Sequence, residues 1–250
     1  MDIYYLINMT KINPILRINA VNKINSVVRT FLYRITNLPN SIKYAKKILL
    51  SKSINISKLT NDGRINSNLD ENEITKLLKD EFKDRLYIPN DRHWYDISIK
   101  DYQYGVLPIN IKSTTTKSCD NIGNLSILLY SLTEHKMRLK NKSYNNGDAS
   151  RHLLNYIKNK DFTKNYKRDY YFIVINKNNP KDIIINSIKG LNKLTSNNNN
   201  LPFQINWSKN TDFKYKNIKD IINLVLKTIQ KPKPSWQEKF LKEIRELSIK

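Results

Sequence analysis

Two stretches near the middle of the chain alternate between apolar and polar positions with a period of two, which is typical of β-strands. The first runs from His93 to Ile99 and the second from Val106 to Lys112. The polar segment 100–105 between them ends in glycine and suits a hairpin loop. Paired as antiparallel strands, the two stretches bring three polar side chains onto one surface, namely Asp96, Asn110 and Lys112.

Apolar residues recur every three or four positions in much of the remaining chain, which predicts helices. These helices cover 15–35, 42–50, 70–86, 125–137, 218–229 and 235–247, and 58–68 is expected to be a loop. A nearly continuous apolar run predicts a central strand at 169–177, and further strands are predicted at 182–188 and 201–207. The order of the elements predicts an α/β (α+β mixed) fold, in which helices flank a central mixed β-sheet.

No internal repeat or low-complexity linker divides the chain. We expect residues 1–66 to form a basic helical N-terminal extension packed on the core, and residues 67–250 to form a single compact unit. Basic residues in the first segment have two interpretations: a DNA-contacting arm, or a helical layer that covers the sheet.

The helix predicted over 70–86 carries acids in unusual places. Asp70 and Glu73 have the spacing of a capping box, which would start the helix at Asp70. At about 100° per residue, Glu71 and Glu81 fall within the apolar stripe, where an acid needs a partner such as a metal or a lysine. For Glu71 a second interpretation stays open, a first-turn acid stabilised by the helix dipole.

The composition narrows the class of protein. Lysine and arginine number 44 against 22 acidic residues, and the net charge of +22 favours a polyanionic partner, nucleic acid ahead of acidic membrane. The abundance of Asn, Ile, Lys and Tyr is also what an AT-rich genome imposes, so the charge supports nucleic-acid binding without proving it. A single cysteine, Cys119, excludes an internal disulfide framework and, with only three scattered histidines, argues against a structural zinc site.

The chain carries no obvious membrane or export signal. No apolar run reaches the roughly 18 residues of a membrane span. The N-terminus begins with an acid and lacks the basic-then-apolar layout of a signal peptide. We therefore expect a cytoplasmic protein.

The polar surface of the hairpin carries groups that can bind a metal ion and act on a phosphate. A carboxylate beside a backbone carbonyl can hold Mg²⁺, and a nearby lysine can orient a water or stabilise charge on a phosphate. Asp96 followed by Asn110-Ile111-Lys112 resembles the signature of the PD-(D/E)xK nuclease superfamily, and within it the type II restriction endonucleases. Tyr95 stands where this family often has proline, and Asn110 replaces its second acid. The competing interpretation is an ordinary hairpin with a polar face.

The resemblance implies roles for these residues. Asp96 and the Ile111 carbonyl are expected to bind Mg²⁺, and Lys112 to activate the attacking water. Because Asn110 supplies an oxygen without a negative charge, a further carboxylate is needed. In the family the helix before the hairpin often carries a glutamate that faces the metal, and Glu71 has the matching offset, with Glu73 as the fallback.

The resemblance also implies partners. The protein is expected to be a Mg²⁺-dependent, sequence-specific double-stranded DNA endonuclease that acts as a homodimer, with a cognate DNA methyltransferase acting on the same site. The polar loop after Lys112 is expected to contact DNA through Ser113, Thr114, Thr115, Thr116, Lys117 and Asn121. Two alternatives stay open: a non-catalytic or degenerate nucleic-acid-binding protein of the same fold, and a repair or intron-mobility nuclease.

Overall fold

A computed structural model describes residues 14–56, 63–90, 93–117, 119–121, 125–135, 146–163, 167–196, 203–228 and 235–246. The contacts divide the chain into two units, Met1–Asn37 and Leu38–Lys250. The first unit contains helix α2 (Pro14–Thr36), which confirms the helix predicted over 15–35. The contacts place helix α3 (Asn40–Ser51) in the second unit, whereas the sequence analysis grouped it with the extension. The packing of the extension on the core stays a prediction.

The second unit is built on a five-stranded sheet with the order β1-β2-β3-β5-β6. Its strands are β1 (Leu86–Tyr87), β2 (Ile97–Asp101), β3 (Gly105–Thr114), β5 (Tyr171–Asn176) and β6 (Asn179–Ser187). Strands β2 and β3 form the predicted antiparallel hairpin, β5 lies parallel to β3, and β6 is antiparallel to β5. The sheet is therefore mixed, as the order of elements predicts.

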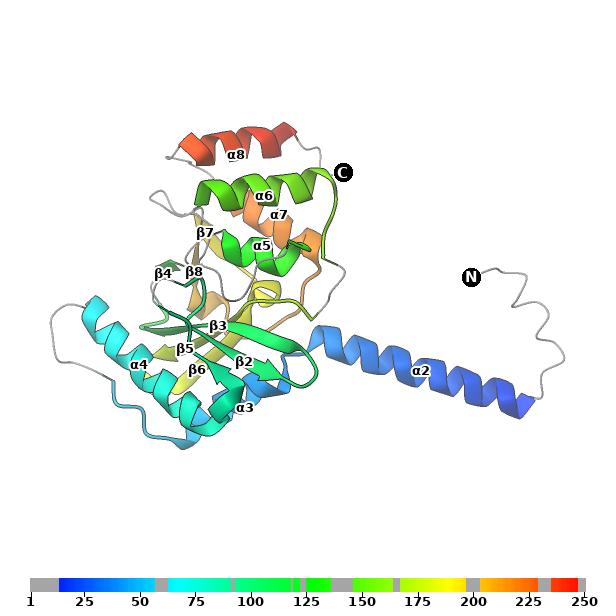
Figure 1. Ribbon diagram of the computed structural model, residues 1–250, viewed down its shortest axis with the longest axis horizontal. Coiled ribbons are helices and arrows are strands. Elements are labelled where there is room, and N and C mark those ends of the chain that lie inside the picture. Colours follow the sequence, from blue (N-terminus) through cyan, green and yellow to red (C-terminus); the bar gives the residue numbers. More distant parts are fainter. Residues whose placement is uncertain are drawn as a thin grey trace. The chain divides into compact units, whose positions relative to one another are not determined.

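Helices cover both faces of this sheet (Figure 1). On one face lie α3 and α4 (Gly63–Phe82), which share an apolar core with β2, β3 and β5. The apolar core on the other face is shared by α5 (Ser126–Leu132), α6 (Asn146–Lys158), α7 (Ile218–Thr228) and α8 (Ser235–Glu246). Of these, α6 packs on α5, and α8 packs on α6 away from the strands. Three short 3₁₀ helices, Lys83–Arg85, Ile188–Gly190 and Trp207–Lys209, connect these elements. No helix in the described ranges is long and apolar enough to cross a membrane.

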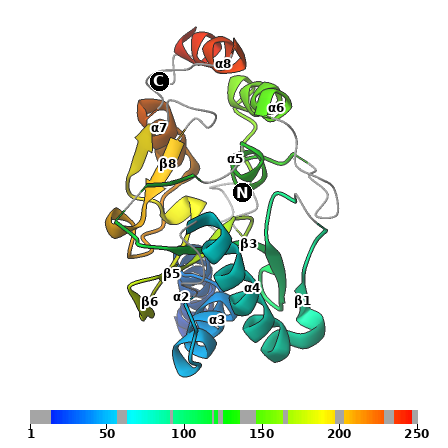
Figure 2. The same ribbon diagram turned by 90° about the vertical axis from the view of Figure 1, so that its left-hand side faces the viewer.

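A second, smaller sheet has the antiparallel order β4-β8-β7 and lies beside α7 (Figure 2). Its strands are β4 (Cys119–Asn121), β7 (Leu194–Ser196) and β8 (Phe203–Asn206). The strand predicted over 201–207 corresponds to β8, but β4 falls within the segment that we predicted as a loop. Strand β4 has only three residues, and it pairs with a strand more than 80 positions away in the sequence. The sequence around it therefore shows no alternation that would predict a strand.

The start of α4 corrects the predicted capping box. The helix begins at Gly63 rather than at Asp70, so residues 63–68 are helical and not a loop. Asp70 lies within the helix with none of its surface exposed, and therefore does not cap it. Likewise β2 begins at Ile97 rather than His93, because Trp94 and Tyr95 are both buried and the alternation fails there.

Candidate active site at the edge of β3

The candidate site lies where β3 runs past the end of its neighbour β2. The last backbone bond between them joins the Asp96 N–H to the Ile109 carbonyl at 3.0 Å. Beyond this point β3 continues to Thr114 beside β5, but no described strand pairs with its other edge. Because the N–H and C=O of one strand residue point to the same side, Ile111 and Ser113 direct their backbone groups to this open edge.

Side-chain carboxylates occupy the positions that a neighbouring strand would fill. The Ile111 N–H donates a hydrogen bond of 2.7 Å to Asp96 Oδ2. Two residues further on, the Ser113 N–H donates to the Glu71 carboxylate. The Ile111 carbonyl points to the same edge between these two acids, so three oxygen-bearing groups from β3, the residue before β2, and α4 converge there.

Asn110 orients the first carboxylate. Its side-chain Nδ2 donates to Asp96 Oδ2 at 2.8 Å, so this oxygen accepts two bonds from β3. The alternation of β3 places Asn110 and Lys112 on one face and the fully buried Ile109 and Ile111 on the other. Asp96 and Lys112 are therefore on the same side of the sheet, as the hairpin pattern predicts.

Glu71 comes from the middle of α4 and meets Lys112. The Lys112 Nζ lies 3.4 Å from Glu71 Oε1, and both side chains keep about a quarter of their surface exposed, 27% and 21%. Glu71 lies two turns into the helix, which excludes its interpretation as a first-turn acid held by the helix dipole. The fallback Glu73 faces away, because its Oε1 accepts the Asn55 N–H at 3.2 Å beside α3.

Burial governs the charges of the two acids. Burial raises the pKa of Asp96, and the Lys112 ammonium and the Ile111 N–H only partly offset it. Burial also raises the pKa of Glu71; Lys112 lowers it, and the nearby Asp96 charge raises it further. Asp96 and Glu71 are thus partly buried, repel each other and share one lysine. A divalent cation bound between the two carboxylates would stabilise their charged forms.

Asp120 is a further acid at this site that the sequence patterns do not indicate. Asp120 lies on β4 and shares a hollow of about 400 Å³ with Glu71, Lys112, Ser67, Asn68, Ser113 and Asn121. Trp207 Nε1 donates to its Oδ2 at 2.7 Å and Thr114 Oγ1 to its Oδ1 at 3.2 Å. Burial raises its pKa, against those bonds and the charges of Lys112 and Lys177. Its fixing partner Trp207 is 87 residues away, so no local signal identifies it.

A buried network under the site fixes α4 against the end of β3. Ser113 Oγ donates to Asp70 Oδ2 at 2.7 Å, and Lys177 Nζ lies 4.0 Å from the same oxygen. Lys177 also donates to Ser67 Oγ at 2.8 Å. Because Asp70 and Glu71 are adjacent on α4, this network sets where the Glu71 carboxylate meets the edge of β3.

The residues expected to contact DNA separate into two groups. Ser113, Thr114 and Thr116 are buried, and Ser113 and Thr114 use their hydroxyls to bind Asp70 and Asp120. Their burial argues against the predicted contact with DNA. The other three are exposed, and for them contact with DNA stays a prediction: Thr115, Lys117 and Asn121.

The oxygen donors at the edge of β3 fit Mg²⁺. This ion takes hard oxygen ligands and is usually held by one or two carboxylates, with water and substrate phosphate completing its shell. Asp96, Glu71 and the Ile111 carbonyl supply that set. No group of three His, Cys, Asp or Glu in the described ranges is close enough to cage a metal.

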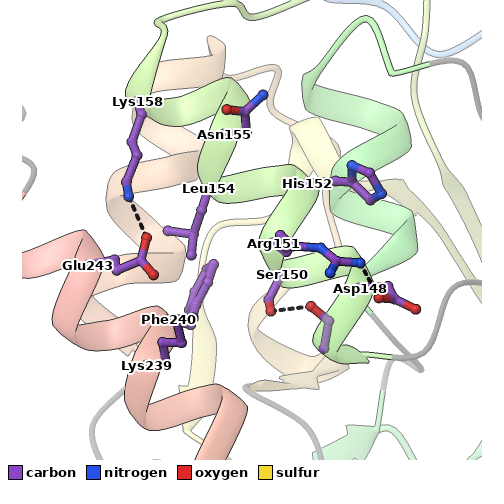
Figure 3. Close-up of a pocket in the computed structure, with 11 residues that line it drawn as sticks. Asp148, Ser150, Arg151, His152, Leu154, Asn155, Lys158, Lys239, Phe240 and Glu243 are labelled. Atoms are coloured by element: carbon purple, nitrogen blue, oxygen red, sulfur yellow. Dashed lines mark hydrogen bonds and ion pairs between the residues drawn. The ribbon is translucent and has the colours of Figure 1, made fainter.

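A larger hollow of about 550 Å³ lies elsewhere, between α6 and α8 (Figure 3). Leu154 and Phe240 line it, and the Lys158–Glu243 ion pair crosses from one helix to the other. It contains none of the residues at the edge of β3. Arg151 is likewise paired with Asp148, so most charged groups of this hollow are engaged with one another rather than directed at a common point.

Comparisons with known proteins give no family for the chain. No protein-family model matches it, and no curated protein sequence matches it. The fold is a mixed α/β architecture with a five-stranded mixed sheet. Such an architecture does not by itself define a function.

Proposed function

We propose that the protein is a Mg²⁺-dependent, sequence-specific double-stranded DNA endonuclease of the restriction type. The observation that carries this proposal is the convergence of Asp96, Glu71 and the Ile111 carbonyl on the open edge of β3, with Lys112 beside them. A cation at this edge lies beside an ammonium group, which is the combination that phosphodiester hydrolysis uses.

Each residue has a role in the proposed reaction. Asp96 and Glu71 would hold the cation with the Ile111 carbonyl, and Asn110 orients Asp96 through its 2.8 Å bond. Lys112 orients the attacking water and stabilises the charge that develops on the phosphate. When bound, Mg²⁺ polarises the scissile phosphate and lowers the pKa of a coordinated water.

The arrangement of the elements supports the same proposal. A helix, α4, precedes the β2–β3 hairpin, then α5 follows, and β5 returns parallel to β3. This is the order that the PD-(D/E)xK superfamily requires of its core. The net charge of +22 adds a long-range attraction for a polyanion. A palindromic target would require two copies related by a two-fold axis, and the proposal includes a homodimer.

The proposal is tested by incubating the purified protein with supercoiled plasmid DNA and Mg²⁺. We expect discrete linear fragments, no cleavage when the metal is chelated, and at least a hundredfold loss of rate in Lys112→Ala. Lys100→Ala is the matched control, because Lys100 is an exposed lysine on the neighbouring strand β2. Equal cleavage by the two variants excludes the assigned role of Lys112.

A second candidate function rests on Asn110. An amide in place of an acid leaves the edge of β3 with less negative charge, which favours a protein of this fold that binds nucleic acid without cutting it. The same plasmid experiment separates the two functions, because this candidate retards the DNA in a gel and leaves it intact at every Mg²⁺ concentration.

A further inference from the structure

The outer face of the small sheet carries three side-chain amides, together with Cys119 and Thr195. Strand β8 buries Phe203 and Ile205 in the core and turns Gln204 and Asn206 outward. Asn121 on β4 lies directly opposite Gln204, so the two share this face. The three amides form the amide face, which is defined by Asn121, Gln204 and Asn206.

The amides are held in place before any ligand arrives. Gln204 Nε2 donates to Asn121 Oδ1 at 2.9 Å across the strands, and Asn206 Nδ2 donates to the Lys117 carbonyl at 3.0 Å. A primary amide has two N–H donors and a carbonyl with two lone pairs, so a single bond orients Gln204 without exhausting it. Oriented polar groups lose less entropy on binding than free ones.

The amide face is continuous with the candidate active site. Asn121 lines the same hollow as Glu71 and Lys112, and its neighbour Asp120 is fixed by Trp207 at the end of β8. The Ser208 N–H donates to the Thr116 carbonyl at 3.0 Å, which ties the end of β8 to the chain leaving β3. A duplex whose phosphate reaches Lys112 therefore passes the amide face.

The amide side chains of this face favour adenine over guanine. Asn and Gln amides pair bidentately with the N6 and N7 atoms of adenine in the major groove, whereas guanine is read by Arg or Lys. Strands β4, β7 and β8 contain no Arg or Lys. Two strands of a sheet fit into a major groove about 12 Å wide, and residues two apart on a strand are roughly 6.8 Å apart, or two base-pair steps.

We propose that the amide face reads adenines in the major groove of the DNA that the β3 edge cleaves, with Gln204 and Asn121 as specificity-determining residues. This inference rests on the proposed function for the position of the DNA, but its test does not require cleavage.

The test is a selection of bound sequences from random double-stranded DNA, carried out with chelator so that nothing is cut. We expect wild-type protein to enrich a motif with fixed A·T pairs. Replacing an adenine of that motif by 7-deazaadenine, which lacks the N7 acceptor, should weaken binding roughly tenfold or more. Gln204→Ala should bind the natural motif equally weakly and be insensitive to the replacement at one adenine.

Gln103→Ala is the matched control, since Gln103 is a glutamine in the β2–β3 turn, outside the small sheet. It should keep the motif and the sensitivity to 7-deazaadenine. An enriched motif without A·T pairs, a preference for RNA, or an unchanged motif in both Gln204→Ala and Asn121→Ala overturns the inference. Cleavage with Mg²⁺ is scored separately: a variant-dependent motif without cleavage refutes the endonuclease alone, and cleavage with an unaltered motif refutes the amide face alone.

Discussion

Glu71 Oε1 lies 3.4 Å from Lys112 Nζ, and this pair joins the middle of α4 to the edge of β3. The carboxylate also accepts the Ser113 N–H, so it contacts both the Lys112 ammonium and the edge of β3. Glu71 therefore brings to the edge of β3 the negative charge that Asn110 does not provide.

Removing this charge tests its role as a metal ligand. We expect Glu71→Gln to lower the affinity for Mg²⁺ roughly tenfold or more, measured by calorimetric titration of the protein without DNA. The glutamine retains the size of the side chain and an acceptor for Ser113, so the fold should be kept. Glu73→Gln is the control from the same helix, because Glu73 binds the Asn55 N–H instead. Equal affinities in the two variants would contradict the assignment.

Restoring the missing acid should change stability in a metal-dependent way. Asn110→Asp loses the 2.8 Å bond to Asp96 and places two half-buried carboxylates next to each other. Losing a hydrogen bond to a charged group costs roughly 1.5–3 kcal/mol, which lowers the melting temperature by several degrees in a chain of this size. Mg²⁺ should restore more of the melting temperature in Asn110→Asp than in the wild type. Thermal unfolding with and without the metal measures both effects, and a variant that is equally stable without metal would argue against close contact of the two residues.

The buried network behind the site should be a major source of stability. Asp70→Ala removes the acceptor of the Ser113 hydroxyl and the counter-charge of the Lys177 ammonium, in a site with no exposed surface at Asp70. Breaking such a pair costs roughly 3 kcal/mol, which urea denaturation resolves. Asp80→Ala, an exposed acid on the same helix, is expected to change the free energy of unfolding by less than about 0.5 kcal/mol. If both variants unfold at the same urea concentration, the network contributes nothing.

The surroundings of Asp101 in the hairpin turn predict that the free energy of unfolding depends on pH. Burial acts to raise the pKa of Asp101, but hydrogen bonds from Ser41, Tyr104 and Gln103 outweigh it and hold the pKa below its usual value. A carboxylate with a depressed pKa stabilises the fold above its unfolded pKa, and this contribution is lost as the pH falls through the folded value. The stability difference between wild type and Asp101→Asn should therefore be largest near neutral pH and shrink below about pH 4.

Urea titrations of both proteins between neutral and acidic pH measure this difference. Asp84→Asn is the control, because Asp84 is an exposed acid in the 3₁₀ helix after α4. A gap between wild type and Asp101→Asn that stays constant with pH would show that the charge of Asp101 has no part in closing the turn.

Local periodicity was enough to predict which side chains meet at the edge of β3. The alternation along β3 places Asn110 and Lys112 on one face, and strand pairing then brings Asp96 to them. The helical wheel places Glu71 toward the core side of α4, but it wrongly groups Glu81 with it, because Glu81 is exposed and lies 3.4 Å from Lys52. The correct inferences succeed because each depends on residues that are near in sequence or on neighbouring strands.

The errors arise where distant partners override local signals. Asp70 and Glu73 match a capping box, yet the helix starts seven residues earlier, because Ser113 and Lys177 satisfy Asp70 inside the fold. Asp120 joins the site because the pairing of β4 with β8 brings Trp207 to it. Neither interaction leaves a trace in the sequence around the acid.

The carboxylates at the open edge of β3 have a consequence for solubility. An unpaired strand edge is a template on which another chain can add by backbone pairing, and such edges promote aggregation. Here Asp96 and Glu71 already hold the Ile111 and Ser113 amides, and their negative charges repel the carbonyl oxygens of an incoming strand. Substitutions that remove both acids should therefore make the protein prone to self-association even where its fold is intact.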